Sequence, residues 1–109
     1  LESDEWYAEM LEYIWQNILF AKKYIDENIP KLKFNIPEGT YLGWIDFNGY
    51  GVYGKNLEDL FEEKLKIAID YGHWFGEEGK GFIRMNFACP REVVVEALER
   101  IKKYFEKNN

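Results

Sequence analysis

The sequence has little of what metal, redox and disulfide chemistry requires. Cys89 is its single cysteine and His73 its single histidine. One thiol cannot build a disulfide framework or a cysteine-rich zinc site, and one imidazole cannot form a histidine cluster. We therefore expect no metal site. The lone thiol also favours a reducing compartment, and so a cytoplasmic location.

Positive charge and long apolar runs are scarce as well. The chain has 14 lysines and arginines against 20 aspartates and glutamates, for a net charge of -6. Nucleic-acid phosphates repel such a balance. No uninterrupted apolar run approaches the roughly 20 residues that a membrane helix needs. Nucleic acid and membrane are therefore not expected partners.

What is present is enough apolar material for one folded core. The 109 residues are 47% hydrophobic and 18% aromatic. That is too apolar for a disordered segment and fits a single domain. The sequence begins with Leu1 rather than methionine, and we expect it to be a piece of a longer protein.

Periodicity predicts the order of helices and strands. Apolar residues in 4–28 recur at steps of three and four, which predicts one long helix that Pro30 ends. The further elements are strands over 32–36 and 41–47, a helix over 56–70, a short extended segment near residue 74, a strand over 82–88 and a helix after Pro90. The order α-β-β-α-β-β-α around one small sheet predicts an α+β fold of two layers.

The first helix carries more apolar surface than a small domain covers. One stripe runs from Tyr7 through Leu11 to Ile25, and a second runs from Trp6 to Tyr24. Part of this face is expected to pack on something outside the chain. Spacing alone leaves two alternatives open, an absent part of the same protein or a second copy of this helix in a dimer.

Strand 82–88 holds the most informative side chain. Alternation with a period of two puts Ile83, Met85 and Phe87 on one face and Arg84 on the other. A guanidinium fixed in mid-strand presents a planar fork that matches a carboxylate. From the residues alone, a solvated arginine on an exposed sheet face is the favoured alternative. His73 and Cys89 have no partner residues for catalysis, so structural roles are favoured for both.

Four segments together resemble a known family. The stretch 82–91, Phe-Ile-Arg-Met-Asn-Phe-Ala-Cys-Pro-Arg, resembles the closing motif of fold-type I pyridoxal-phosphate enzymes, in the class-II aminotransferase branch that includes bacterial cystathionine β-lyases. The hairpin 36–44, the Trp-Phe-Gly of 74–76 and the Glu-Trp of 5–6 are similar to further segments of that branch, in the same order. The resemblance covers nearly the whole chain.

The resemblance implies a fold, a cofactor and site residues. It implies an interdomain helix over 1–29 and a C-terminal small domain over 30–109 of an aminotransferase or carbon–sulfur β-lyase. Arg84 would bind the α-carboxylate of an amino-acid substrate, with Thr40 and Tyr41 near the substrate side chain. The full enzyme would be a homodimer that uses pyridoxal 5'-phosphate.

The family's cofactor lysine belongs to a large domain whose motifs do not occur in this sequence. We therefore expect no catalytic and no cofactor-binding residue in these 109 residues, and no activity from them alone. A different class of function also stays open. The chain could be a stand-alone module that binds amino acids or a protein and dimerises through its first helix.

Overall fold

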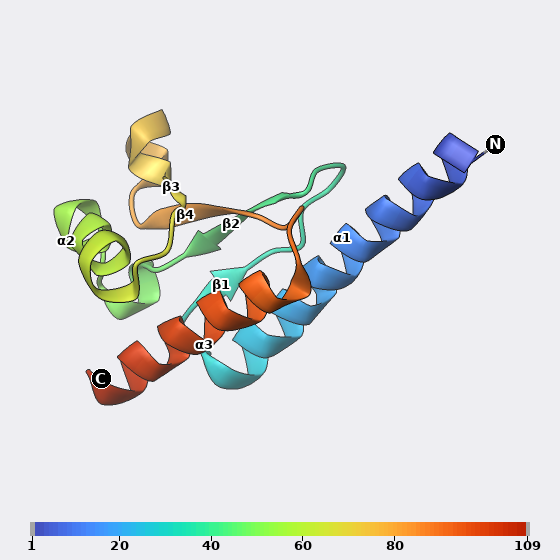
Figure 1. Ribbon diagram of the computed structural model, residues 1–109. Helices are drawn as coiled ribbons and strands as arrows, with labels where there is room; N and C mark the ends of the chain where they lie inside the picture. The colour runs from blue at the N-terminus through green and yellow to red at the C-terminus, as the bar shows by residue number, and fades with distance from the viewer. Residues whose placement is uncertain (1, 109) are drawn as a thin grey trace.

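The computed structural model describes the backbone of residues 2–108 and the side chains of residues 4–108. Three helices and four strands follow one another in the described residues, with short 3-10 turns between some of them (Figure 1). In chain order they are α1 (Glu2–Asn28), β1 (Lys33–Phe34), β2 (Leu42–Asp46), α2 (Gly54–Asp59, continued by a π-helical segment, Leu60–Leu65), β3 (Asp70–Tyr71), β4 (Phe82–Asn86) and α3 (Arg91–Lys107). The extended segment expected near residue 74 is a 3-10 turn, Gly72–Phe75, and the strand before it lies at Asp70–Tyr71.

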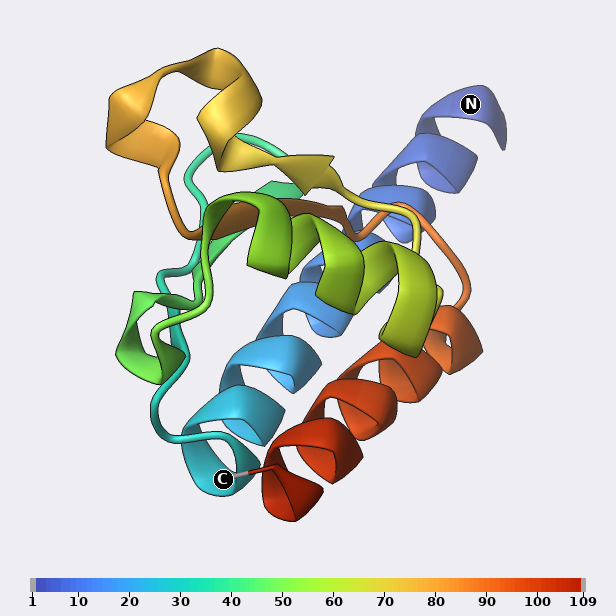
Figure 2. The ribbon, with the colours of Figure 1, turned by 90° about the vertical axis from the view of Figure 1, so that its left-hand side faces the viewer.

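The four strands form one antiparallel sheet in the order β1-β2-β4-β3. Helices α1 and α3 lie side by side beneath one face of this sheet (Figure 2). Between the sheet and the helices lies a core of aliphatic and aromatic side chains, which includes Ile18, Ile25, Ile45, Ile83 and Leu98. Within residues 2–108 no α-helix packs on the opposite face, so that face is open where it is not covered by the 3-10 turns.

Close packing explains why β2 contains a glycine. A Cβ atom at Gly43 would lie 2.6 Å from the ring of Phe34 and 2.8 Å from the ring of Phe87. These two rings stack on each other at 5.4 Å between centroids. A side chain at position 43 would therefore push these two rings apart and disturb the packing of the hairpin formed by β1 and β2.

The second helix differs from the sequence expectation at both ends. It begins at Gly54 rather than at Asn56, so Asn56 does not cap it. It ends at Leu65 rather than near residue 70, because Lys66 adopts a left-handed conformation with φ 56°. Arg100 of α3 donates from Nη1 to the carbonyl of Leu65 at 2.9 Å, which satisfies the freed helix end. The chain released by this early ending becomes strand β3.

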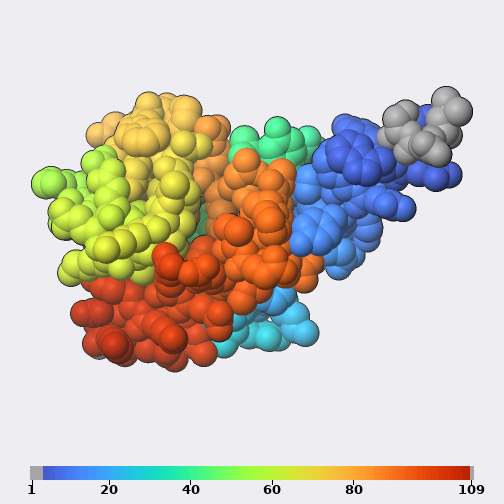
Figure 3. Space-filling model, viewed as in Figure 1, coloured from blue at the N-terminus to red at the C-terminus, as the bar shows by residue number. Residues whose placement is uncertain are grey.

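The first half of α1 extends beyond the body of the domain (Figure 3). From Ile14 onward the helix contributes buried side chains to the core. Before that point its large side chains are open, with Trp6 64% and Tyr7 55% exposed. Residues on both sides of the boundary expected at residues 29 and 30 contribute to one core, and the boundary itself stays a prediction. No helix in the described part of the chain combines the length and apolarity that a membrane span requires.

Candidate functional site

The open face of the sheet carries a row of three side chains across neighbouring strands. Trp44 of β2 and Asp70 of β3 are the residues directly opposite Arg84 of β4. The alternation predicted for 82–88 is confirmed, since Ile83 and Met85 are buried in the core. Residues that oppose each other across strands have side chains close enough to interact. The register therefore fixes what surrounds the guanidinium.

The guanidinium of Arg84 is held on one edge by a carboxylate and lies close to two aromatic rings. Its Nε and Nη2 donate to Oδ2 of Asp70 at 3.2 and 2.9 Å. Its guanidinium carbon lies 4.8 Å from the ring centroid of Phe75 and 5.6 Å from that of Trp44. Both distances lie within the range at which a guanidinium is attracted to an aromatic ring.

The ion pair is not buried, which bears on what it does. The side chains of Arg84 and Asp70 are 28% and 44% exposed. An ion pair at this exposure stabilises a fold by no more than about 1 kcal/mol. The contact therefore matters more for where the guanidinium points than for the stability of the domain.

A pocket of about 540 Å³ opens beside Arg84 on this face. Thr40, one of the residues expected at a substrate site, lines it together with Trp44 and Phe82. The hydroxyl oxygen of Thr40 accepts a hydrogen bond from the backbone N–H of Leu42 at 3.2 Å, which holds the loop before β2. The structure therefore brings two of the three expected residues, Arg84 and Thr40, to one cavity.

Tyr41, the third expected residue, lines a different pocket. That pocket has a volume of about 690 Å³ and lies between the loop before β2 and the apolar side of α1, where Trp15 also lines it. Tyr41 is 48% exposed. Its assignment to the substrate side chain stays a prediction, and it does not share the cavity of Arg84.

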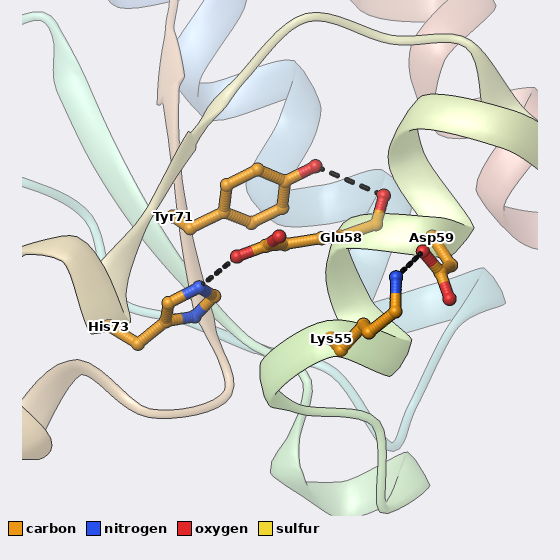
Figure 4. A network of polar contacts seen from close by, with 5 residues as sticks. All are labelled: Lys55, Glu58, Asp59, Tyr71 and His73. Atoms are coloured by element: carbon orange, nitrogen blue, oxygen red, sulfur yellow. Dashed lines mark hydrogen bonds and ion pairs between the residues drawn. The ribbon is translucent and has the colours of Figure 1, made fainter.

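His73 belongs to a small network that fastens the turn η3 (Gly72–Phe75) to α2 (Figure 4). Its Nε2 lies 2.5 Å from Oε2 of Glu58, and its ring stacks on Tyr71 at 5.4 Å. The hydroxyl of Tyr71 donates to the backbone carbonyl of Glu58 at 3.3 Å. Because Phe75 lies in the same turn, this network positions the ring that packs on Arg84.

Tyr71 provides a test of this network by pH. Burial first, and then nearby carboxylates, raise the pKa of Tyr71 to about 12. The folded state therefore keeps the phenol proton more tightly than the unfolded chain. The protonated phenol of Tyr71 therefore stabilises the fold fully below about pH 10, and this stabilisation is lost as the pH rises to about 12. The loss amounts to about 3 kcal/mol. Urea unfolding of the chain across this pH range should show it.

Tyr71→Phe is the matched control for that measurement, because it keeps the ring and removes the titrating hydroxyl. Other tyrosines also titrate in this range, so the difference between wild type and variant is the quantity to compare. An equal loss of stability in both proteins would contradict a raised pKa at Tyr71.

Cys89 carries no sign of an activated thiol. Burial raises its pKa, which disfavours the thiolate needed for nucleophilic or redox chemistry. Its Sγ contacts the backbone carbonyl of Asn86 at 3.5 Å. Within residues 4–108, no group of three or more histidine, cysteine, aspartate and glutamate side chains could hold a metal ion.

Two residues of this site were not found from the sequence. Asp70 was expected at the end of a helix, and its pairing with Arg84 depends on β3, a strand of only two residues. Trp44 was noted as part of a hairpin but not as a neighbour of Arg84. A weak signal was available for Asp70, because Ile69 and Tyr71 enclose it in a short run of strand formers.

The chain is similar to pyridoxal-phosphate enzymes in both sequence and structure, as the resemblance implied. No family model matches the sequence. It is 33% identical to the cystathionine β-lyase PatB of Bacillus subtilis over 97 residues. This alignment covers 89% of the chain and 25% of PatB.

Two solved structures make the similarity specific. Cystalysin from Treponema denticola, which contains a pyridoxal 5'-phosphate cofactor, matches with a TM-score of 0.93 and 35% identity, over 99% of this chain and 27% of cystalysin. A pyridoxal-phosphate-bound protein of Clostridium difficile 630, assigned as an aminotransferase, matches with a TM-score of 0.87 and 49% identity, over 92% of this chain and 26% of that one. The chain thus spans about a quarter of the length of these relatives.

The pocket beside Arg84 does not have the charge balance of a cofactor phosphate site. The pocket beside Arg84 sets Lys33 and Arg84 against the carboxylates of Glu38 and Asp46. A phosphate group needs a surplus of positive charge or converging backbone N–H groups, and this balance offers no surplus. The pocket fits a small ligand with one carboxylate better than it fits pyridoxal phosphate.

Proposed function

We propose that the chain is the C-terminal small domain of a pyridoxal-phosphate-dependent aminotransferase or carbon–sulfur β-lyase of the cystathionine β-lyase type. In this role Arg84 binds the α-carboxylate of the amino-acid substrate. The observation that carries the proposal is the position of Arg84, half-exposed on the open face of the sheet at the wall of a pocket. The similarity to cystalysin over almost the whole chain supports it.

The chemistry of the site favours an amino acid as the ligand. Every α-amino acid carries a carboxylate, and the guanidinium fork matches its two oxygens in one plane. Fixing that plane would orient the bonds at the α-carbon before reaction. Thr40 lines the same pocket and would contact the remainder of the substrate. Tyr41 would reach the substrate only if its side chain turned from its own pocket.

The exposed first half of α1 supports the assignment of residues 1–29 as an interdomain helix. Trp6, Tyr7 and Leu11 leave an apolar surface open along the part of α1 that extends beyond the body, and Trp15 continues it on the next turn. Monomeric domains rarely leave such a surface uncovered. A large cofactor domain would cover it, and the share of the relatives' length that this chain leaves out provides room for such a domain.

In this proposal the chain contributes binding and orientation, and no catalytic residue. The lysine that bonds the cofactor and the groups that hold its phosphate would lie in the large domain. Closing the small domain over that site would deliver Arg84 and exclude water from the reaction. The complete enzyme would be a homodimer.

The proposal is tested on the full-length protein that carries this chain. After reconstitution with pyridoxal 5'-phosphate, we expect it either to transfer amino groups to a keto acid or to release ammonia and pyruvate from cystathionine. The isolated 109-residue chain is the control and should do neither. Binding of amino acids by the isolated chain, as tightly as by the full-length protein, would instead favour a stand-alone binding module.

A further inference from the structure

We propose that Asp70 is a positioning residue for Arg84. It holds one edge of the guanidinium so that the other edge faces a substrate carboxylate. This inference rests on the proposed function, because it assigns a role to a second residue of the same site. It goes further because it assigns one edge of the guanidinium to Asp70 and the other edge to the substrate carboxylate.

The hydrogen bonds define which edge is occupied. Nε and Nη2 carry N–H groups on the same long edge of the guanidinium, and both of them donate to Oδ2 of Asp70. In the described part of the chain, no protein acceptor is bonded to Nη1 of Arg84. The end formed by Nη1 and the second hydrogen of Nη2 is therefore left for a ligand. That end offers two parallel donors, the number that a bidentate carboxylate uses.

The sheet fixes Asp70 in this place. Asp70 and Arg84 are opposed in the antiparallel pairing of β3 with β4, so their side chains leave the same face of the sheet. Trp44 is opposed to Arg84 from the other side, and its ring meets that of Phe75 edge-on at 5.8 Å. The carboxylate of Asp70 fixes the rotation of the guanidinium through two hydrogen bonds, and the two rings pack close to it.

The sign of the effect distinguishes positioning from competition. A carboxylate beside Arg84 could instead act as an internal substitute for the substrate, which would have to be displaced before binding. Removing the charge of Asp70 would then tighten the binding of amino acids. Under the positioning role, removing it weakens binding, because the guanidinium is freed to rotate away from its productive direction.

The test measures dissociation constants by titration calorimetry on the full-length holoenzyme, without a keto acid. The probes are L-methionine and 3-(methylthio)propylamine, which is the same molecule without its carboxylate. In Asp70→Asn we expect methionine binding to weaken by about tenfold, less than the ~100-fold that a 1 Å misplacement can cost. Binding of the amine should stay within about twofold. Asp70→Glu restores the charge and should recover part of the loss.

Two further variants separate the possible failures. Asp26→Asn removes a carboxylate that is paired with Lys22 on α1, far from the site, and should change neither dissociation constant. If Arg84→Ala leaves methionine binding unchanged, the proposed function itself fails. If Arg84→Ala weakens it but Asp70→Asn leaves it unchanged or tightens it, only the role of Asp70 is wrong. Equal weakening of both probes in Asp70→Asn would show a general structural effect and overturn the inference.

Discussion

Replacement of Arg84 by alanine in the full-length protein should weaken amino-acid binding by about 2–5 kcal/mol. That range corresponds to roughly 30- to 5,000-fold in the dissociation constant. The reason is that a substrate carboxylate brought into the closed site would lose water and find no partner. The dissociation constant or KM of an amino-acid substrate measures the effect, and the stability of the domain should change little, because the ion pair of Arg84 is half-exposed.

Arg84→Lys gives a graded comparison. Lysine keeps the positive charge but has no planar fork. It therefore cannot make two parallel hydrogen bonds to a substrate carboxylate and at the same time keep the contact that Arg84 makes with Asp70. We expect binding between that of wild type and that of Arg84→Ala. Normal affinity in both variants would rule out Arg84 as the carboxylate receptor and leave its aromatic neighbours as purely structural contacts.

The second large effect is expected at Asn17, in the buried half of α1. Its side chain is fully buried, and its Nδ2 donates to the carbonyls of Phe87 and Cys89 at 3.0 and 2.8 Å. Its Oδ1 accepts a hydrogen bond from Nε of Arg91 at 2.6 Å. Asn17 therefore joins α1 to the link between β4 and α3. Alanine at this position would leave these groups without partners, and we expect it to lower the free energy of unfolding by about 2–4 kcal/mol.

Urea unfolding of the chain measures this loss, with Gln16→Ala as the matched control. Gln16 is the neighbouring residue of the same helix, but its side chain is exposed, and among the described residues it donates a hydrogen bond to Glu12. Its replacement should change the free energy of unfolding by no more than about 0.5 kcal/mol. A loss below about 1 kcal/mol for Asn17→Ala would mean that other groups or water take over its hydrogen bonds.

Periodic patterns in the sequence were sufficient to predict the main elements. The spacing of Ile14, Ile18 and Ile25 predicted the buried side of α1, and the alternation around Arg84 predicted which way its side chain leaves the sheet. Both patterns are local, since they depend on residues within a few positions of one another. That is why the direction of Arg84 could be inferred without coordinates.

The partners of Arg84 and the role of Asn17 could not be inferred in the same way. Asp70 meets Arg84 only because β3 pairs with β4 in one register, and a shift of one residue would turn Asp70 to the other face. Asn17 lies on the apolar side of a helix, and its contribution to stability depends on hydrogen bonds to carbonyls some 70 residues further along the chain. Such contacts follow from tertiary packing, which spacing in the sequence does not encode.

Thr40 and Tyr41 relate differently to the two cavities. Thr40 lies where the cavities adjoin and lines both of them, whereas Tyr41 lines only the cavity against α1. A resemblance that assigns both residues to one substrate names a stretch of chain, and the structure places only Thr40 in the cavity of Arg84.

The way α1 is anchored determines how the arginine can move. The second half of this helix shares a core with the sheet that bears Arg84, while its first half stands clear of the body. If the protruding half tilted, the sheet would therefore move with the helix as a rigid body. Arg84 would travel with the domain as one rigid piece, its ring contacts and its carboxylate partner intact, instead of flipping between rotamers on a stationary support.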